Sequence, residues 1–240
     1  MERVAIVTGG TRGIGEAVSI ALRDAGFSVA ASFVGSIDRA RCFSEATGIK
    51  SFQWDVADYD ACHAAADRIA EELGPVDVLV NNAGITRDAS VLKMSREAWS
   101  EVLDTNVSGC FNMVKAVLPG MRDRNWGRIV NVGSINGQAG QFGQVNYSAS
   151  KSAIHGFTKA LAQEGARFGV TVNTVAPGYI NTDMVAAVPP EQLAKIVAKV
   201  PVGRLGEAHE IARVVAFLCA EESSFITGST ISINGGQHMY

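Results

Sequence analysis

Short runs of β-branched residues alternate with longer segments of helical periodicity, and this alternation constrains the fold more than any other feature of the chain. Repeated strand–helix–strand units are typical of a parallel sheet covered by helices. The connecting segments are long enough for crossover helices. The sequence therefore predicts an α/β fold, a doubly wound parallel sheet of about seven strands with helices on both faces. The expected strands are residues 4–7, 28–34, 49–54, 76–80, 128–132, 170–175 and 230–233.

One segment departs from this alternation. No linker rich in proline, glycine or serine divides the chain, so residues 1–240 are expected to form a single domain. Residues 181–204, however, carry Pro189, Pro190 and Pro201 and are longer than an ordinary connection. We interpret them as a lid over a substrate cleft, with an irregular surface excursion as the alternative.

Composition excludes several classes of partner. The net charge of -3 gives no basic field for nucleic acid. No apolar run reaches the roughly 18 to 20 residues that cross a bilayer, and the first residues begin a strand rather than a signal peptide, so no membrane partner and a cytoplasmic location are expected. The histidines have no ligand-like spacing, and no metal site is predicted. Reduced, packed thiols are expected at Cys42, Cys62, Cys110 and Cys219.

A glycine-rich turn joins the first expected strand to the first helix, with the sequence Thr8-Gly9-Gly10-Thr11-Arg12-Gly13-Ile14-Gly15. Glycines let the backbone turn tightly and approach a pyrophosphate, which then meets the free N–H groups and the positive end of the helix dipole. Its spacing is G-x-x-x-G-x-G rather than the common G-x-G-x-x-G. Placed after strand one, the turn predicts a dinucleotide site in a Rossmann-type domain; a purely structural turn is the alternative.

Charge near the second strand indicates which dinucleotide is bound. An NAD site usually has an acidic residue at the end of this strand. Here residues 31–35 contain none, and the first acid is Asp38. A guanidinium binds the 2′-phosphate of NADP well, whereas a carboxylate repels it. We therefore expect NADPH/NADP+, with Arg12 as the best phosphate ligand and Arg39 as the second, although each arginine alone is also compatible with an ordinary solvated charge.

Tyr147 and Lys151 place a phenol and an ammonium four residues apart, on one face of a helix. A phenol is a weak acid at neutral pH, and a nearby cation favours its ionised form. This pair by itself is often a surface feature of a helix. Its interpretation as a proton-transfer site depends on the residues around it.

Those residues follow other expected strands. Ser134 follows strand 128–132, the N-N-A-G run at 81–84 follows strand 76–80, and Pro177-Gly178 follows strand 170–175, while Asn106 falls in the next helix. Ligands of open parallel sheets bind beyond the carboxyl ends of the strands. Together the motifs predict a cofactor cleft with a proton-transfer site.

With these motifs the chain resembles the short-chain dehydrogenase/reductase family from end to end. The resemblance implies a catalytic tetrad of Asn106, Ser134, Tyr147 and Lys151, with Asp55 at the adenine ring and Thr182 at the carboxamide or a phosphate. Motifs and resemblance together place cofactor contacts at Gly9, Thr11, Arg12, Gly13, Ile14, Gly15, Arg39, Asp55, Val56, Asn82, Ala83, Gly84, Tyr147, Lys151, Pro177, Gly178, Ile180 and Thr182.

Within that family the chain is similar to two groups of reductases: those acting on acetoacetyl-CoA in polyhydroxyalkanoate (polyhydroxybutyrate) synthesis, and those acting on 3-oxoacyl carrier proteins in fatty-acid synthesis. The stretch 134–144 and Trp126-Gly127-Arg128 resemble the first group more closely. The resemblance implies reduction to the (R)-3-hydroxyacyl thioester by a homotetramer. Its implied substrate contacts are Asp88, Ser134, Gln141, Phe142, Gly143, Gln144, Tyr147, Gly178 and Tyr179.

The implied mechanism assigns a task to each member of the tetrad. NADPH supplies hydride, Tyr147 gives a proton to the carbonyl oxygen, and Ser134 polarises that carbonyl. Lys151 supports Tyr147 and the nicotinamide ribose, and Asn106 holds a water that relays a proton through Lys151. A sugar or steroid alcohol dehydrogenase of the same family is a further enzymatic alternative. A protein that only senses or scaffolds NADP has no need of all four residues, although the fold alone permits it.

Overall fold

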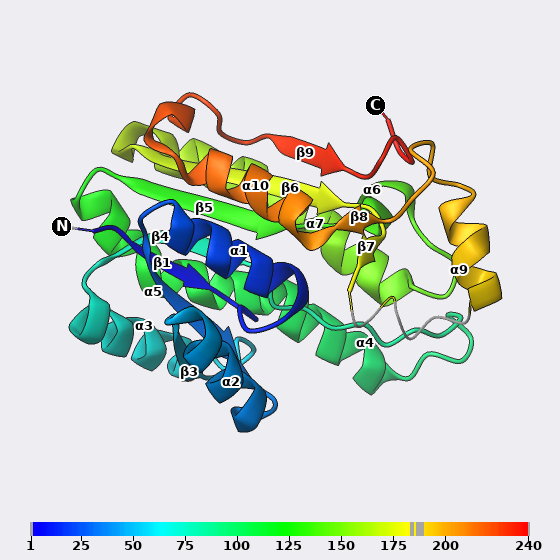
Figure 1. The fold of residues 1–240 in the computed structure, drawn as a ribbon, viewed down its shortest axis with the longest axis horizontal. Helices are drawn as coiled ribbons and strands as arrows, with labels where there is room; N and C mark the ends of the chain where they lie inside the picture. The colour runs from blue at the N-terminus through cyan, green and yellow to red at the C-terminus, as the bar shows by residue number, and fades with distance from the viewer. Residues whose placement is uncertain (1, 183–184, 186–189, 240) are drawn as a thin grey trace.

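A computed structural model describes residues 2–182, 185 and 190–239. Within these residues the seven expected strands are present, as β1 Val4–Val7, β2 Ser28–Phe33, β3 Lys50–Gln53, β4 Val76–Asn81, β5 Gly127–Val132, β6 Val170–Pro177 and β9 Thr230–Ile233. They form one parallel sheet in the order β3-β2-β1-β4-β5-β6-β9 (Figure 1). The predicted Rossmann-type, doubly wound α/β fold is confirmed.

Helices cover both faces of this sheet. They are α1 Gly13–Asp24, α2 Ile37–Thr47, α3 Tyr59–Leu73, α4 Arg96–Leu103, α5 Gly109–Asp123, α6 Ile135–Ala139, α7 Val145–Gly165, α9 Pro190–Val197 and α10 Ala208–Cys219. Figure 1 shows α1 and α10 in front of the sheet and α5 and α7 behind it. Because both faces are covered, β1, β5 and β6 are buried along their whole length, and β1 is apolar at every position.

Two apolar clusters bind these layers together. In front of the sheet, α1 and α10 contribute Val18, Leu22, Ile211, Val215 and Leu218. Behind it, α3, α5 and α7 contribute Ile69, Met113, Val117, Met121 and Leu161. The helical spacing of these side chains puts them on one face of each helix.

The chain changes direction across the sheet between β1 and β4. β2 and β3 lie on one side of β1, and β4, β5, β6 and β9 lie on the other. The loops that follow β1 and β4 therefore diverge, and such a switch point leaves a crevice at the carboxyl ends of the strands. This crevice is where the sequence motifs are expected to meet.

A second, very small sheet was not predicted. Ile180–Asn181 (β7) pairs in parallel with Gly206–Glu207 (β8). Strands of two residues are too short to produce an alternating pattern. They flank the predicted lid at 181–204, whose residues 183–184 and 186–189 lie outside the described residues, so the lid stays a prediction.

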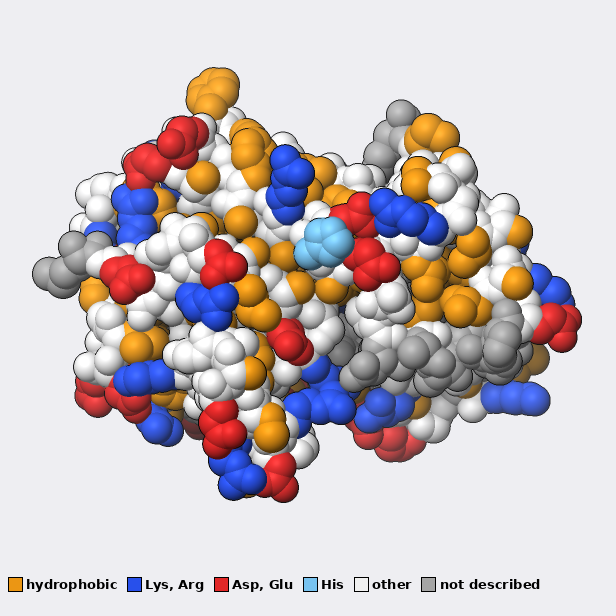
Figure 2. All heavy atoms as spheres, in the orientation of Figure 1, with side chains coloured by type: hydrophobic (Ala, Val, Ile, Leu, Met, Phe, Trp, Pro, Cys, Tyr) orange, Lys and Arg blue, Asp and Glu red, His pale blue; other side chains and the backbone are white. Residues whose placement is uncertain are grey.

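The surface seen in Figure 2 carries acidic and basic side chains interspersed rather than in one large patch of either sign. Among the helices that the structure describes, none is long and apolar enough to cross a membrane. Within the same part of the chain, no three His, Cys, Asp or Glu side chains are grouped so as to hold a metal ion.

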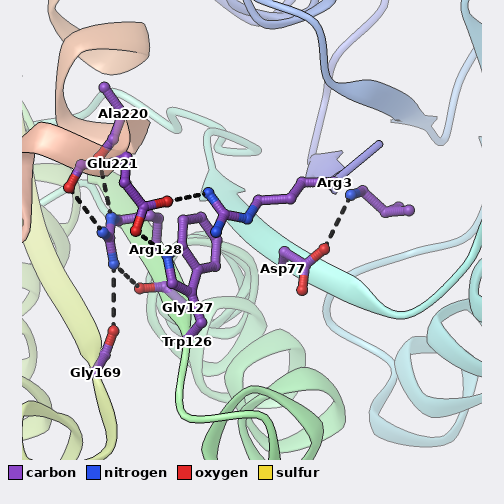
Figure 3. Close-up of polar contacts among 9 residues, drawn as sticks. Arg3, Asp77, Trp126, Gly127, Arg128, Gly169, Ala220 and Glu221 are labelled. Atoms are coloured by element: carbon purple, nitrogen blue, oxygen red, sulfur yellow. Dashed lines mark hydrogen bonds and ion pairs between the residues drawn. The ribbon is translucent and has the colours of Figure 1, made fainter. Parts of the chain in front are cut away.

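The amino end of β5 contains a buried cation. Arg128 is 1% exposed, and burial lowers the pKa of its guanidinium. The guanidinium donates hydrogen bonds to main-chain carbonyls that end several elements (Figure 3), namely those of Gly127 at 2.9 Å, Gly169 at 3.2 Å, Ala220 at 3.3 Å and Glu221 at 3.5 Å. These bonds connect the start of β5 to the turn before β6 and to the turn after α10.

Aromatic and charged side chains surround this guanidinium. The Trp126 ring has the guanidinium carbon of Arg128 4.4 Å from its centroid and that of Arg3 3.6 Å from it (Figure 3). The carboxylate of Glu221 pairs with Arg3 and accepts a hydrogen bond from Trp126 Nε1 at 3.4 Å. The amino end of the sheet is therefore closed by side chains that satisfy one another.

Candidate active site

A cleft of about 770 Å³ lies at the carboxyl ends of the strands. All of the predicted cofactor contacts line it, from the glycine-rich turn to Thr182. Ser134, Gln144, Tyr147, Gly178 and Tyr179 line the same cleft. The structure thus brings together residues that are distant in sequence, while the role of each stays a prediction.

The start of α1 forms one end of this cleft. Its N-cap residue, Arg12, makes no side-chain hydrogen bond to the helix, so the first N–H groups of α1 remain for a ligand. Gly13 has a φ of 54°, a conformation that other residues rarely adopt. At Gly15 a Cβ would lie 2.1 Å from the carbonyl oxygen of Gly9. The backbone of the turn therefore requires glycine at these two positions, and its contact with a phosphate stays a prediction.

The N-N-A-G run braces this turn from the neighbouring strand. Thr8 Oγ1 accepts hydrogen bonds from the backbone N–H groups of Asn82 at 2.9 Å and Ala83 at 3.0 Å. In return, Asn82 Nδ2 donates to the carbonyl oxygens of Thr8 at 2.9 Å and Gly9 at 3.1 Å. The loops on the two sides of the switch point are thus held at a constant separation.

The other end of the dinucleotide site has no carboxylate where β2 ends. The cleft is lined there by residues 33–36, together with Arg12 and Arg39. Ser36 caps α2 by accepting a hydrogen bond from the backbone N–H of Arg39 at 3.2 Å. Asp55 lines the cleft further along, and its Oδ1 accepts from the N–H of Ala57 at 2.9 Å. The guanidinium groups of Arg12 and Arg39 are donors of the kind that binds a phosphate. Ser36 is a lining residue that the sequence did not single out.

Tyr147 and Lys151 extend from the first two turns of α7. Lys151 is 5% exposed, and its Nζ lies 5.8 Å from the centroid of the Tyr147 ring. Nζ donates a hydrogen bond to the carbonyl oxygen of Val132, at the end of β5, at 2.7 Å. Among the described residues this is the only hydrogen-bond acceptor of Nζ, so the ammonium retains N–H groups for a ligand.

Ser134 lies directly beyond the end of β5 and caps α6. Its Oγ accepts a hydrogen bond from the N–H of Asn136 at 3.1 Å, and within the described part of the chain its hydroxyl donates to no acceptor. The side chain is therefore held as a donor that faces the cleft. This orientation suits the polarisation of a substrate carbonyl.

Asn106 is placed in a π-helical turn, Asp104–Ser108, between α4 and α5 rather than in a regular α-helix. Its Oδ1 accepts from the N–H of Ile85 at 2.8 Å, and its Nδ2 donates to the Ile85 carbonyl at 3.1 Å and to Ser150 Oγ at 3.0 Å. Ser150 Oγ in turn donates to the Tyr147 carbonyl at 2.7 Å. Asn106, which does not line the cleft, thus ties the loop after β4 to the helix of Tyr147. A π-helical turn is a tertiary feature that sequence periodicity does not indicate.

At the substrate end, a row of polar side chains continues from Tyr179. Burial raises the pKa of the Tyr179 hydroxyl, and a hydrogen bond with Asn136 opposes that effect. Asn136 Nδ2 donates to Gln144 Oε1 at 2.8 Å, and Gln144 Nε2 donates to Asp88 Oδ2 at 2.8 Å. Asn136 connects Tyr179 to Gln144 in this row, and sequence reasoning missed it although it lies two residues after Ser134.

Four predicted substrate residues do not line the cleft. Asp88 is connected to it through Gln144, and the backbone N–H of Ala89 donates to the Gly143 carbonyl at 2.8 Å. Gln141 is exposed, and Phe142 is 91% exposed. Their contact with substrate stays a prediction.

The sheet order, the glycine-rich turn and the cleft that Tyr147 and Lys151 line are those of an α/β dinucleotide-binding protein. The family model for short chain dehydrogenases matches residues 3–193. The chain belongs to this family, as the sequence predicted.

Relatives match over almost the whole chain. The acetoacetyl-CoA reductase of Shinella zoogloeoides is 58% identical over 238 residues, which cover 99% of each protein. The acetoacetyl-CoA reductase of Cupriavidus necator is 52% identical over 243 residues, again 99% of each. The 3-oxoacyl-[acyl-carrier-protein] reductase of Escherichia coli is 44% identical over 239 residues, 99% of this chain and 98% of that protein.

Proposed function

We propose that this protein is an NADPH-dependent acetoacetyl-CoA reductase that forms (R)-3-hydroxybutanoyl-CoA for polyhydroxybutyrate synthesis. The observation that carries the proposal is the convergence of Ser134, Tyr147 and Lys151 on one cleft with the glycine-rich turn. The identity to acetoacetyl-CoA reductases over 99% of the chain supports the choice of substrate. The stereochemistry and the metabolic role rest on the family resemblance.

The cofactor contacts follow from the donor groups of the cleft. The N–H groups at the start of α1 would hold the pyrophosphate, and Arg12, Arg39 and Ser36 would hold the phosphate on the adenosine ribose. The absence of a carboxylate among residues 33–36 favours NADPH over NADH. When bound, this cofactor supplies the hydride.

The substrate carbonyl is activated by side chains of the protein. Ser134 donates a hydrogen bond to the carbonyl oxygen and stabilises the negative charge that develops there, an effect typically worth about 3 to 4 kcal/mol for one donor. Tyr147 donates the proton that completes the alcohol. Because Ser134 is held by the Asn136 N–H, its donor direction is set before substrate enters.

Lys151 and Asn106 support the proton donor. The positive charge of Lys151 stabilises the phenolate that Tyr147 leaves after proton transfer, and its remaining N–H groups reach the nicotinamide ribose. Asn106 acts first as a positioning residue, because its amide holds Ile85 and Ser150. A water relay at Asn106 and Lys151 completes the proposed path of the replacement proton.

The wider setting of the enzyme is part of the same proposal. Residues 1–240 form one catalytic domain in which 181–204 act as a substrate lid, and the enzyme is a cytoplasmic homotetramer. Asp88, Gln141, Phe142 and Gln144 line the path of the acyl-CoA. The presence of 3-oxoacyl-[acyl-carrier-protein] reductases among the relatives makes the carrier-linked thioester the second candidate substrate.

Initial rates of NADPH oxidation test the proposal. The purified protein is assayed with acetoacetyl-CoA and with acetoacetyl-acyl carrier protein, each also with NADH. A much higher kcat/KM for the CoA thioester with NADPH is expected. Preference for the carrier protein moves the enzyme to fatty-acid synthesis, and turnover of neither thioester refutes the proposal. Tyr147→Phe is the control; it should remove turnover and retain NADPH binding by fluorescence titration.

A further inference from the structure

A second, smaller cavity lies beside the cleft. Its volume is about 120 Å³, and its side-chain lining is mainly apolar, from Ile180, Val200, Val202, Ile211 and Ile233. An apolar cavity of roughly 150 Å³ in another protein stays dry and binds benzene. This cavity therefore has room for about three or four carbon atoms of an aliphatic chain.

The polar side chains at its border satisfy each other. Arg204 Nη1 donates to Glu210 Oε2 and Arg204 Nη2 to Glu210 Oε1, both at 2.8 Å. Glu210 Oε2 also accepts from the N–H of Glu207 at 2.8 Å. Because these charges are engaged with each other and with the start of α10, they do not require a charged ligand. The remaining lining favours an apolar one.

Tyr179 stands between the cavity and the cleft. Tyr179 and its neighbour Ile180 line both spaces. The hydroxyl of Tyr179 is bonded to Asn136 on the cleft side, and its carbonyl accepts from the N–H of Gly206 at 2.9 Å on the other side. The hydroxyl of Tyr179 and its backbone are thus both held at the boundary between the two spaces.

The geometry points to a specificity site: the cavity behind Tyr179 is a binding site for the distal carbons of longer 3-oxoacyl chains, and Tyr179 closes it, which limits this enzyme to the four-carbon substrate. The inference rests on the proposed function and names its chain-length determinant. In acetoacetyl-CoA only a methyl group lies beyond the reacting carbonyl. A six-carbon chain adds two methylenes, which the Tyr179 ring would exclude.

The test compares kcat/KM for 3-oxohexanoyl-CoA and acetoacetyl-CoA in the full-length enzyme. Tyr179→Ala should raise kcat/KM for the six-carbon substrate relative to that for the four-carbon substrate by about 10-fold or more. This is the effect expected from burying two methylenes. The absolute rate on acetoacetyl-CoA falls, because the Asn136 contact is lost. Tyr179→Phe is the matched control, since it loses the same hydroxyl but keeps the ring, and its ratio should stay within threefold of wild type.

A second variant closes the cavity from the far side. Val200 is 7% exposed and lines the cavity, so Val200→Phe should fill it. The double variant Tyr179→Ala, Val200→Phe should return the ratio to the wild-type value. Thermal unfolding and NADPH titration of every variant establish that each is folded, and Tyr179→Val replaces Tyr179→Ala if the latter is not.

The outcomes separate the two proposals. Wild-type protein that reduces no 3-oxoacyl thioester refutes the proposed function. If the wild type reduces acetoacetyl-CoA but Tyr179→Ala leaves the ratio of the two kcat/KM values unchanged, the role of the cavity is refuted and the proposed function stands. The same holds if Val200→Phe does not reverse the effect of Tyr179→Ala. Equal use of both chain lengths by the wild type also refutes the role of Tyr179 in closing the cavity.

Discussion

The two ends of β5 each hold a buried cation, and the fold treats them differently. Arg128 at the amino end is 1% exposed, and Lys151 at the carboxyl end is 5% exposed. The Arg128 guanidinium donates to carbonyls of several elements, whereas the Lys151 ammonium has one acceptor among the described residues, the Val132 carbonyl. Four main-chain carbonyls accept hydrogen bonds from the Arg128 guanidinium, whereas the Lys151 ammonium keeps donors for a ligand.

The difference shows what burial of a charge does in each place. A buried cation that is bonded to the carbonyls of several segments holds those segments together, and its removal loses these hydrogen bonds. A buried cation with free donors adds less to folding, but it is available to substrate and cofactor. Stability at the amino end and chemistry at the carboxyl end should therefore be separable by mutation.

The largest effect is expected at the carboxyl end. Lys151→Met removes the charge that supports Tyr147, so kcat/KM for acetoacetyl-CoA should fall by about 10²- to 10⁴-fold. The urea midpoint should change little, because methionine keeps the packing of the aliphatic side chain and the ammonium loses one hydrogen bond to the protein, that to Val132. Steady-state kinetics and urea unfolding of the same preparation measure both. A variant that keeps more than a fifth of the wild-type activity would contradict the role given to Lys151.

Removal of the cation at the amino end should have the opposite result. Arg128→Met removes the hydrogen bonds of the guanidinium to the carbonyls of Gly127, Gly169 and Ala220, and the free energy of unfolding should fall by about 3 to 5 kcal/mol. The rate at 25 °C should remain within about threefold of wild type, since Arg128 lies far from the cleft along β5. Arg128→Lys, which restores the charge but not the planar set of donors, should recover only part of the loss. Equal unfolding free energies for Arg128→Met and wild type would mean that the cation at the amino end of β5 does not stabilise the fold.

Two buried thiols can measure local opening at the two ends of β5. Burial raises the pKa of Cys219, beside Arg128, to about 12 and that of Cys110, near Lys151, to about 11. Neither should react with a disulfide reagent at pH 8 in the native protein. In mild urea, in a Cys42→Ser background that removes the exposed thiol, Cys110 should be labelled about 10-fold faster than Cys219.

NADPH is the control for this labelling experiment. It should slow the labelling of Cys110, because bound ligand stabilises the carboxyl end against local opening, and it should leave Cys219 unchanged. Mass spectrometry of peptides gives both rates. Equal labelling rates would mean that the two ends open together.

The smallest effect concerns an exposed ion pair near the cleft. The hydrogen bonds from Arg204 and from the Glu207 N–H lower the pKa of Glu210 from 4.5 to about 2. A carboxyl group with a lowered folded pKa stabilises the protein above pH 4.5 and loses that contribution as the pH falls toward 2. Tm of wild type and Glu210→Gln should differ by about 1 to 3 °C at pH 7. The difference should shrink below pH 4.5 and vanish near pH 2; a constant difference would exclude the charge as its cause.

Much of the fold could be predicted because its signals are local. The apolar run of β1, the glycines after it and the spacing of Val18 and Leu22 all act within a few residues, and each appears where the pattern indicated. The two-residue strands β7 and β8 could not be predicted, since their pairing depends on Ile180 meeting Gly206 and Asn181 meeting Glu207 in space. The π-helical turn around Asn106 is set by its contacts with Ile85 and Ser150 rather than by its own sequence.

The sequence by itself determined the strand–helix alternation, the phosphate-binding turn and the phenol–ammonium pair of Tyr147 and Lys151, because each depends on spacing along one element. Only the tertiary structure decided which polar side chains meet. It placed Asn136 between Tyr179 and Gln144, and it buried Arg128 against carbonyls of distant segments. The physical reason is that hydrogen bonds between segments distant in sequence depend on how the elements pack. No local pattern of residues encodes which of these segments come within hydrogen-bond distance.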